Sequence, residues 1–263
     1  MIKDQTVLIT GASGGIGADF ADIFARNGYN LVLIARNDLA LEQLAERLTS
    51  RYQVSVKVLP KDLSLPNAAD EALDFLQNES INIDVLVNNA GMGTFGPFAD
   101  TDFIALTQLM NLNIVTVTQL TRLLLPPMLS RKRGKILNVA STAAFQPGPL
   151  MAAYYASKAY VLWLSEALAN ELKGTGVTVT ALCPGPVRTG FQKRANMEDS
   201  GLLSGKLLSV MDSKTVAEIG YKGLMKEKEI VIPGLLNKVG AFGVRVAPRK
   251  IVTQITRKIQ EKR

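Results

Sequence analysis

The sequence predicts an α/β fold, a single-domain doubly wound parallel sheet of about seven strands flanked by helices. Short runs rich in Val and Ile alternate with longer segments of helical period, as in successive βαβ units. The short runs lack polar/apolar alternation, which is typical of strands covered on both faces. No linker, repeat or low-complexity segment divides the 263 residues, of which 47% are hydrophobic.

The first half of the chain supplies four of the expected strands and the helices between them. The strands are Thr6–Thr10, Leu31–Ala35, Ser55–Leu59 and Val85–Val87. The helices are one ending near Asn27, one carrying Leu41, Leu44, Ala45 and Leu48 at helical spacing, one over Ala68–Gln77, and a long one containing Asn113–Leu125.

The second half completes the sheet and adds a tail. The strands are Ile136–Val139, Val177–Cys183 and Glu229–Ile232, and a long helix covers Tyr154–Leu172. We expect one catalytic domain over residues 1–247, with an apolar lid at about 190–210, and a basic amphipathic helix over 248–263. An ordinary pair of helices packed on the body is the alternative to the lid.

Composition excludes several chemistries. The chain has no histidine, so a Ser-His-Asp or Cys-His triad is impossible, and no metal site is expected. Acid–base chemistry must therefore use Tyr, Lys, Asp or Glu. The single cysteine, Cys183, cannot form an internal disulfide and is interpreted as a small buried residue. No signal segment or apolar stretch of roughly 18 residues is apparent, so we expect a cytoplasmic protein without a membrane span.

The positive charge is concentrated at the C-terminus. The formal net charge is +7, but residues 245–263 hold seven basic residues against Glu261 alone. The rest of the chain is nearly balanced, so nucleic acid is not an expected partner. In the tail, Ile251, Ile255 and Ile259 recur every four residues. We expect this stripe to dock on the body or on a partner subunit; peripheral contact with an anionic membrane is the alternative.

A glycine-rich turn follows the first strand. It reads Thr10-Gly11-Ala12-Ser13-Gly14-Gly15-Ile16-Gly17. Glycine permits positive φ and close approach of a phosphate, and the next helix directs its free N–H groups at that point. The turn therefore predicts a dinucleotide site at the carboxyl edge of the sheet.

The end of the second strand indicates which dinucleotide binds. An acidic residue there would hold the ribose hydroxyls of NAD, whereas this strand ends Ile34-Ala35-Arg36-Asn37. A guanidinium matches a 2′-phosphate in charge and geometry, so Arg36 favours NADP. A solvated surface arginine is the alternative.

Tyr154 and Lys158 are separated by one helical turn, on the same face of a helix. A cation beside a tyrosine favours the phenolate, so we expect Lys158 to lower the pKa of Tyr154 toward neutrality. Tyr155 also neighbours Lys158, and spacing alone does not choose between the two tyrosines.

Together these motifs resemble the short-chain dehydrogenase/reductase family, across at least residues 6–190. The resemblance rests on Thr10-Gly11-x-x-x-Gly15-Ile16-Gly17, Asp62, Asn88-Asn89-Ala90-Gly91, Asn113, Ser141, Tyr154-x-x-x-Lys158 and Pro184-Gly185-Pro186-Val187-Arg188-Thr189, in the family's order. The thirteen residues from Ser141 to Tyr154 also match and select Tyr154 over Tyr155.

The resemblance implies a Rossmann fold and a role for each residue. Tyr154 would be the proton donor and acceptor, Ser141 would bind the substrate oxygen, and Lys158 would lower the tyrosine pKa and hold the nicotinamide ribose. Asn113 would place a water in a proton relay to Lys158. The implied NADP-binding set is Gly11, Ser13, Gly15, Ile16, Gly17, Arg36, Asp62, Leu63, Asn89, Ala90, Gly91, Tyr154, Lys158, Pro184, Gly185, Val187 and Thr189.

The expected function follows from this site and its surroundings. Candidate substrate-lining residues are mostly apolar: Met92, Phe95, Phe145, Leu150, Met151, Phe191, Met197, Leu202, Leu203, Leu207 and Leu208. We expect an NADP-dependent carbonyl reductase or alcohol dehydrogenase acting on a hydrophobic ketone, aldehyde or secondary alcohol. The alternatives are a membrane-surface reductase of lipid carbonyls and a non-catalytic NADP sensor. Members of this family commonly form dimers or tetramers, so the resemblance implies a homodimer or homotetramer formed through helices around 105–130 and 154–172.

Overall fold

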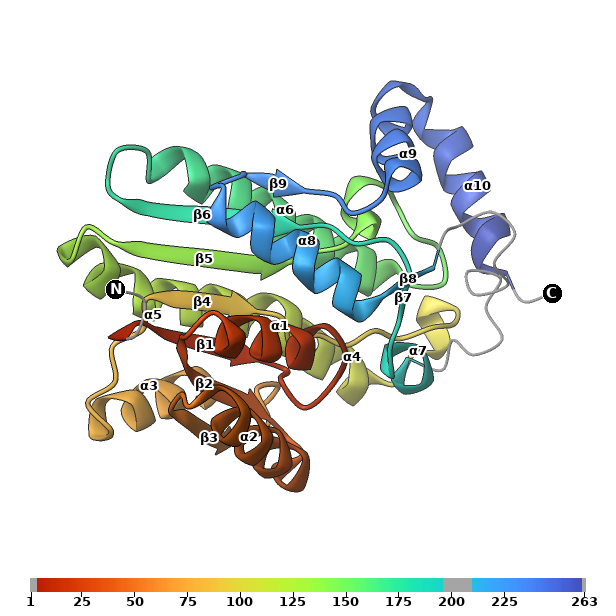
Figure 1. The fold of residues 1–263 in the computed structure, drawn as a ribbon. Helices are drawn as coiled ribbons and strands as arrows, with labels where there is room; N and C mark the ends of the chain where they lie inside the picture. Colours follow the sequence, from red (N-terminus) through yellow and green to blue (C-terminus); the bar gives the residue numbers. More distant parts are fainter. Residues whose placement is uncertain (1–3, 196–209, 262–263) are drawn as a thin grey trace.

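The computed structural model describes residues 4–195 and 210–261 (Figure 1). Within them, seven strands form one parallel sheet in the order β3-β2-β1-β4-β5-β6-β9. The strands are β1 (Thr6–Thr10), β2 (Asn30–Ala35), β3 (Val56–Pro60), β4 (Val85–Asn88), β5 (Gly134–Val139), β6 (Val177–Leu182) and β9 (Ile230–Val231). This confirms the doubly wound α/β prediction, and each expected strand is present to within two residues at either end.

Helices cover both faces of the sheet. On one face lie α1 (Gly15–Arg26), α2 (Asp38–Tyr52) and α8 (Ser213–Met225). On the other face lie α3 (Ala68–Asn78), α5 (Val117–Ser130) and α6 (Ala152–Glu171). Successive residues of β1 belong to different cores: Val7 and Ile9 pack against the first group of helices, and Leu8 packs against the second. Strands buried on both faces explain the absence of polar alternation.

One long helix runs without a break from Phe103 to Ser130. It consists of α4 (Phe103–Met110), the π-helical turn η3 (Asn111–Thr116) and α5. By length and composition alone it would qualify as a membrane span, contrary to our expectation from the sequence. In the structure, however, Leu120, Leu124 and Met128 pack in the core against the sheet. The C-terminal part of this helix is therefore one of the helices that cover the sheet.

Several elements were not predicted. The short segments are η2 (Phe98–Asp100), η4 (Thr142–Phe145), α7 (Phe191–Arg194) and the parallel pair β7 (Val187–Arg188) and β8 (Met211–Asp212). Helices α8 and α9 (Leu235–Val246) were not predicted either, and α9 precedes the predicted tail helix, α10 (Arg249–Gln260). The two form a hairpin beyond the carboxyl end of the sheet (Figure 1).

The tail helix docks on a different face from the one predicted. Its buried residues are Val252, Thr256 and Gln260, while Ile251 and Ile255 are 50% and 52% exposed. The expectation that the isoleucine stripe docks on the body is therefore wrong for Ile251 and Ile255, while Ile259 is half-buried; docking on a partner subunit stays a prediction. The buried face is displaced by one residue from the predicted one, and on it Gln260 donates a hydrogen bond to the buried Tyr155 hydroxyl.

Candidate active site

The loop between β1 and α1 forms a backbone cradle. Gly11 and Gly15 adopt left-handed conformations, with φ of +67° and +55°. A Cβ on Gly11 would lie 2.9 Å from the Ala90 Cα, and a Cβ on Gly17 would collide with the Gly11 carbonyl oxygen. No side chain from the described residues caps the start of α1, and its first turn holds no acid. The free N–H groups and close backbone approach fit a pyrophosphate.

Hydrogen bonds join this loop to the end of β4. The Thr10 hydroxyl accepts from the backbone N–H groups of Asn89 and Ala90, both at 3.0 Å. The Asn89 side-chain amide donates to the Thr10 carbonyl at 2.9 Å. Strands β1 and β4 are the neighbours from which the sheet runs in opposite directions, so these bonds fix the crevice where nucleotides bind in such sheets.

The end of β2 presents Arg36 to solvent. Its side chain is 66% exposed and lies 3.8 Å from an Asp62 carboxylate oxygen. The other Asp62 oxygen accepts from the Ser64 N–H and hydroxyl, at 2.9 and 2.7 Å. The Leu63 side chain lies in the core, so only its backbone faces this region. Ser13 is also exposed. The loosely paired Arg36 guanidinium leaves most of its donors available to a phosphate.

Tyr154, Ser141 and Lys158 meet at the carboxyl ends of β5 and β6. Ser141 lies close enough to the phenol of Tyr154 to lower its pKa, and the Ser141 hydroxyl donates to the Pro184 carbonyl at 3.4 Å. The Lys158 ammonium lies 5.8 Å from the centre of the Tyr154 ring and donates to the Val139 carbonyl at 2.8 Å. The Ser141 hydroxyl also accepts from the Ala143 N–H at 3.1 Å, so it caps η4 as well.

Burial controls the protonation of this group. It raises the pKa of Tyr154 to about 12, and the neighbouring Ser141 opposes this rise. It lowers the pKa of Lys158 to about 8. We expected Lys158 to lower the Tyr154 pKa toward neutrality; in this structure the pKa is raised instead, because desolvation of the phenol outweighs the opposing effect of Ser141. The phenol is protonated at neutral pH and can donate a proton.

Asn113 lies in η3, the π-helical turn, in which backbone hydrogen bonds join residues five apart instead of four. Its amide nitrogen donates to the Met92 carbonyl at 2.9 Å and to the Ser157 hydroxyl at 3.0 Å, while its oxygen accepts from the Met92 N–H. A Cβ on Gly91 would lie 3.4 Å from both the Asn113 oxygen and the Lys158 ammonium. The two polar groups therefore flank one glycine. Ser157, a positioning contact inside the Tyr-Lys motif, was not predicted.

The segment after β6 connects the glycine loop to α9. Thr189 lies beside Gly15, and a Cβ on Gly185 would lie 2.5 Å from the Asn237 side-chain oxygen. The Pro184 carbonyl accepts from the Thr142 N–H at 2.8 Å, and Val187 is buried in β7. Asn237 belongs to α9 and was missed because that helix was not predicted.

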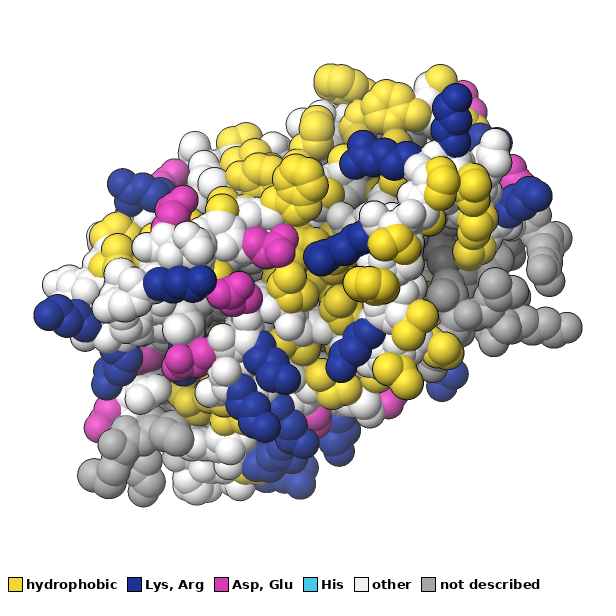
Figure 2. Space-filling view, turned by 90° about the horizontal axis from the view of Figure 1, so that it is seen from above, with side chains coloured by type: hydrophobic (Ala, Val, Ile, Leu, Met, Phe, Trp, Pro, Cys, Tyr) yellow, Lys and Arg dark blue, Asp and Glu magenta, His cyan; other side chains and the backbone are white. Residues whose placement is uncertain are grey.

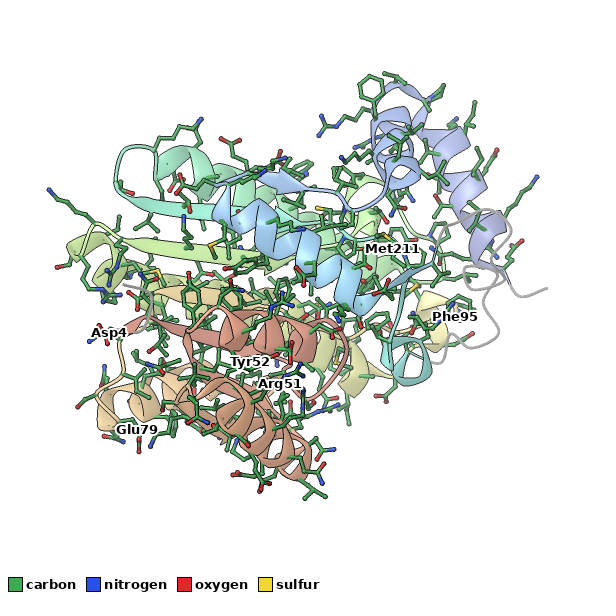
Figure 3. The ribbon with its side chains drawn as sticks, viewed as in Figure 1. Asp4, Arg51, Tyr52, Glu79, Phe95 and Met211 are labelled. Carbon is green, nitrogen blue, oxygen red and sulfur yellow. The ribbon has the colours of Figure 1, made fainter. Side chains whose placement is uncertain are left out.

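Beside Tyr154 the structure places an apolar cluster, made of Ala143, Met151, Tyr155 and Ala195 with Phe95 and Phe191. The rings of Tyr154 and Phe191 are 5.4 Å apart, centre to centre. Figure 3 labels Phe95 beside α7, at the carboxyl side of the sheet. Of the expected lining, Phe95, Met151 and Phe191 meet here, whereas Phe145 packs in a separate cluster. Met197, Leu202, Leu203, Leu207 and Leu208 lie outside the described residues.

Tyr155 joins this cluster to the tail. Its hydroxyl accepts a hydrogen bond of 2.7 Å from the side-chain amide of Gln260, which is fully buried. The last turn of α10 thus reaches the neighbour of the candidate acid. Cys183 is buried, as expected, and burial raises the pKa of its thiol to about 12, so it is unreactive.

Similarity to known proteins identifies the class of enzyme to which this site belongs. Residues 5–200 match the family model for short chain dehydrogenases. The chain therefore belongs to the short-chain dehydrogenase/reductase family and is an oxidoreductase.

Three similar proteins are informative. The very-long-chain 3-oxoacyl-CoA reductase of Pyrenophora tritici-repentis is 38% identical over 71% of this chain and 56% of its own length. The ketoacyl reductase HetN of Nostoc sp. is 32% identical over 88% of this chain and 79% of its own length. A short-chain dehydrogenase from Sphingobium yanoikuyae, solved in complex with NADPH, is 35% identical, covers 92% of this chain and 93% of its own, and superposes with a TM-score of 0.81. The chain spans little more than half the length of the first of these.

Proposed function

We propose that this protein is an NADP(H)-dependent reductase of hydrophobic ketones, with a long-chain 3-oxoacyl thioester as the substrate class. The observation that carries the proposal is the protonated Tyr154 phenol, which lies beside Ser141 and has apolar side chains on one side. A polar proton donor beside an apolar wall suits a carbonyl group on a hydrocarbon chain. Two relatives are named as reductases of 3-oxoacyl or ketoacyl groups.

The glycine cradle, the uncapped start of α1 and exposed Arg36 fit NADP(H), which supplies the hydride when bound. Ser141 orients the substrate carbonyl, and Tyr154 donates its proton to the oxygen as negative charge develops there. Lys158, a cation below its pKa of about 8, stabilises the resulting phenolate. Asn113 holds the Met92 backbone and Ser157 in place beside Lys158.

The choice of NADP over NAD is tested at Arg36. We expect Arg36→Ala to weaken NADPH binding about 10- to 100-fold, the equivalent of losing one charge-assisted contact to phosphate, and to leave NADH binding unchanged. Arg47→Ala is the matched control, because Arg47 is also an exposed, ion-paired arginine but contacts Asp22. Equal affinity of the unmodified protein for NADPH and NADH would contradict the assignment.

The substrate class is tested by NADPH consumption with 3-oxoacyl thioesters of increasing chain length, bulky ketones and a small water-soluble ketone. We expect turnover efficiency to rise with chain length. If only bulky ketones are turned over, the protein is a ketone reductase and the proposal of a thioester substrate is wrong. No turnover of any carbonyl, with NADPH still bound, would favour a non-catalytic sensor.

We also propose a cytoplasmic homodimer or homotetramer formed through the long helix Phe103–Ser130 and α6. Exposed Phe103 and Trp163, at 76% and 68%, support this. So does a shallow apolar pocket on α6 lined by Ala159, Tyr160, Trp163 and Leu164. Burial of the free thiol of Cys183 is compatible with a reducing compartment. Light scattering of the unmodified protein and of Trp163→Glu measures the assembly; a monomer before substitution would refute it.

A further inference from the structure

The hairpin of α9 and α10 carries an exposed apolar surface. We call it the hairpin surface, and its apolar side chains are between 50% and 76% exposed: Leu235, Leu236, Val239, Phe242, Val246, Ile251 and Ile255. Helices of soluble monomers normally bury such residues against the body. Here the body-facing positions are taken by Asn237, Ala241, Val252, Thr256 and Gln260 instead.

The same surface is strongly cationic. Its exposed basic residues are Lys238, Arg245, Arg249, Lys250, Arg257 and Lys258. Within residues 235–261 the single acidic residue is Glu261, which pairs with Arg257 at 2.8 Å. Figure 2 looks down on this end of the molecule, and its right half shows hydrophobic and basic side chains intermixed. Acidic side chains are more frequent in the left half.

Charge complementarity selects the occupant. A second copy would place the same cations opposite one another across a twofold axis, with one carboxylate per chain to compensate. A nucleic acid would leave Phe242 and the exposed leucines without apolar contacts. An anionic lipid surface satisfies both features, because acyl chains receive the apolar side chains and headgroup phosphates receive the cations.

We propose that the hairpin surface binds membranes that contain anionic lipids. The hairpin lies at the membrane interface with Leu236, Phe242 and their apolar neighbours among the lipid chains. This property does not depend on the proposed reductase activity, since it resides in surface side chains outside the Ser141-Tyr154-Lys158 group.

The inner face of the hairpin connects this surface to the site. Gln260 holds Tyr155 in the apolar cluster, and Asn237 packs against Gly185. A membrane bound on the outer face is thus separated from the apolar cluster by the thickness of the hairpin.

The test is co-sedimentation of the full chain with vesicles of phosphatidylcholine alone or mixed with phosphatidylglycerol. We expect binding to the mixed vesicles that weakens with salt, and little binding to phosphatidylcholine. Leu236→Ser combined with Phe242→Ser should reduce the partition coefficient at least about tenfold, from lost apolar burial. Arg249→Gln combined with Lys250→Gln should reduce it about 25-fold at low salt, at about 1 kcal/mol per cation.

The matched control is Leu39→Ser combined with Leu65→Ser, since these leucines are 68% and 51% exposed but follow β2 and β3, at the opposite edge of the sheet from β9. It should bind like the unmodified chain, and circular dichroism verifies the fold of every variant. Absence of binding to the mixed vesicles, or an equal loss in the control, would overturn the proposal. If the hairpin variants change the oligomeric state and not vesicle binding, the surface is an interface between two copies.

Discussion

The glycine loop and the α9–α10 hairpin both border the same site, but they are built by different means. The loop is held by backbone: Gly11 and Gly17 approach other main-chain atoms so closely that a side chain would collide. The hairpin is held by a few buried side chains, and most of its apolar residues face outward. Positioning a cofactor requires fixed main-chain geometry, whereas a surface for lipid requires side chains left free.

The largest expected effect is on ketone turnover and concerns Tyr154, which lies between the glycine loop and the hairpin. Tyr154→Phe should lower ketone turnover about 100- to 10,000-fold, because the proton donor is lost, and should leave NADPH binding unchanged. Tyr155→Phe is the control, since it removes only the hydroxyl that contacts Gln260. NADPH consumption and NADPH fluorescence measure the two properties. Equal losses in both variants would show that the tyrosines act through packing.

The buried Lys158 makes a pH-dependent contribution to stability. Its pKa falls from 10.5 to about 8 on folding, so the unfolded chain binds more protons between those values, and the free energy of unfolding should rise with pH across that window. The full shift corresponds to about 3 kcal/mol. Lys158→Met should remove the rise, as measured by urea unfolding at neutral pH and near the upper limit of the window. The same rise in both proteins would mean that Lys158 is not desolvated.

The glycine loop should tolerate a methyl group at one glycine and not at another. Gly17→Ala should reduce the free energy of unfolding by about 1–3 kcal/mol, because the Cβ meets the Gly11 carbonyl and the Asn89 amide. Gly14→Ala should change it by less than about 0.5 kcal/mol, since a Cβ there meets nothing within 4 Å. Thermal unfolding of the cofactor-free protein checks both. Equal tolerance would mean that the loop is not held by backbone contact.

The smallest effect concerns which face of α10 docks. Val252→Ser should lower the free energy of unfolding by about 1–2 kcal/mol, because a buried apolar group is lost. Ile251→Ser should alter it by less than about 0.5 kcal/mol in water, since Ile251 is half exposed. Denaturant unfolding compares the two. The opposite ranking would restore the isoleucine stripe as the docking face.

The sequence predicted the cofactor side in detail and the hairpin poorly, for a physical reason. A glycine turn and a Tyr-Lys pair are local patterns, so the sequence indicates where they lie, although their spacing did not choose between Tyr154 and Tyr155. Helix α9 has no comparable marker, because Leu235, Leu236 and Val239 resemble core residues although they are exposed. The Tyr154 pKa was misjudged because the spacing to Lys158 says nothing about how deeply the phenol is buried.

The sequence alone determined the order of the motifs along the chain, the absence of histidine from any catalytic group, and the family. Each of these depends on residue identity and local spacing. The tertiary structure decided which face of α10 is buried, that Gln260 holds Tyr155, and that burial dominates the acid–base pair. These depend on contacts between residues as far apart as Tyr155 and Gln260. No local pattern encodes such contacts, because packing of the whole chain determines which side chains lose their water.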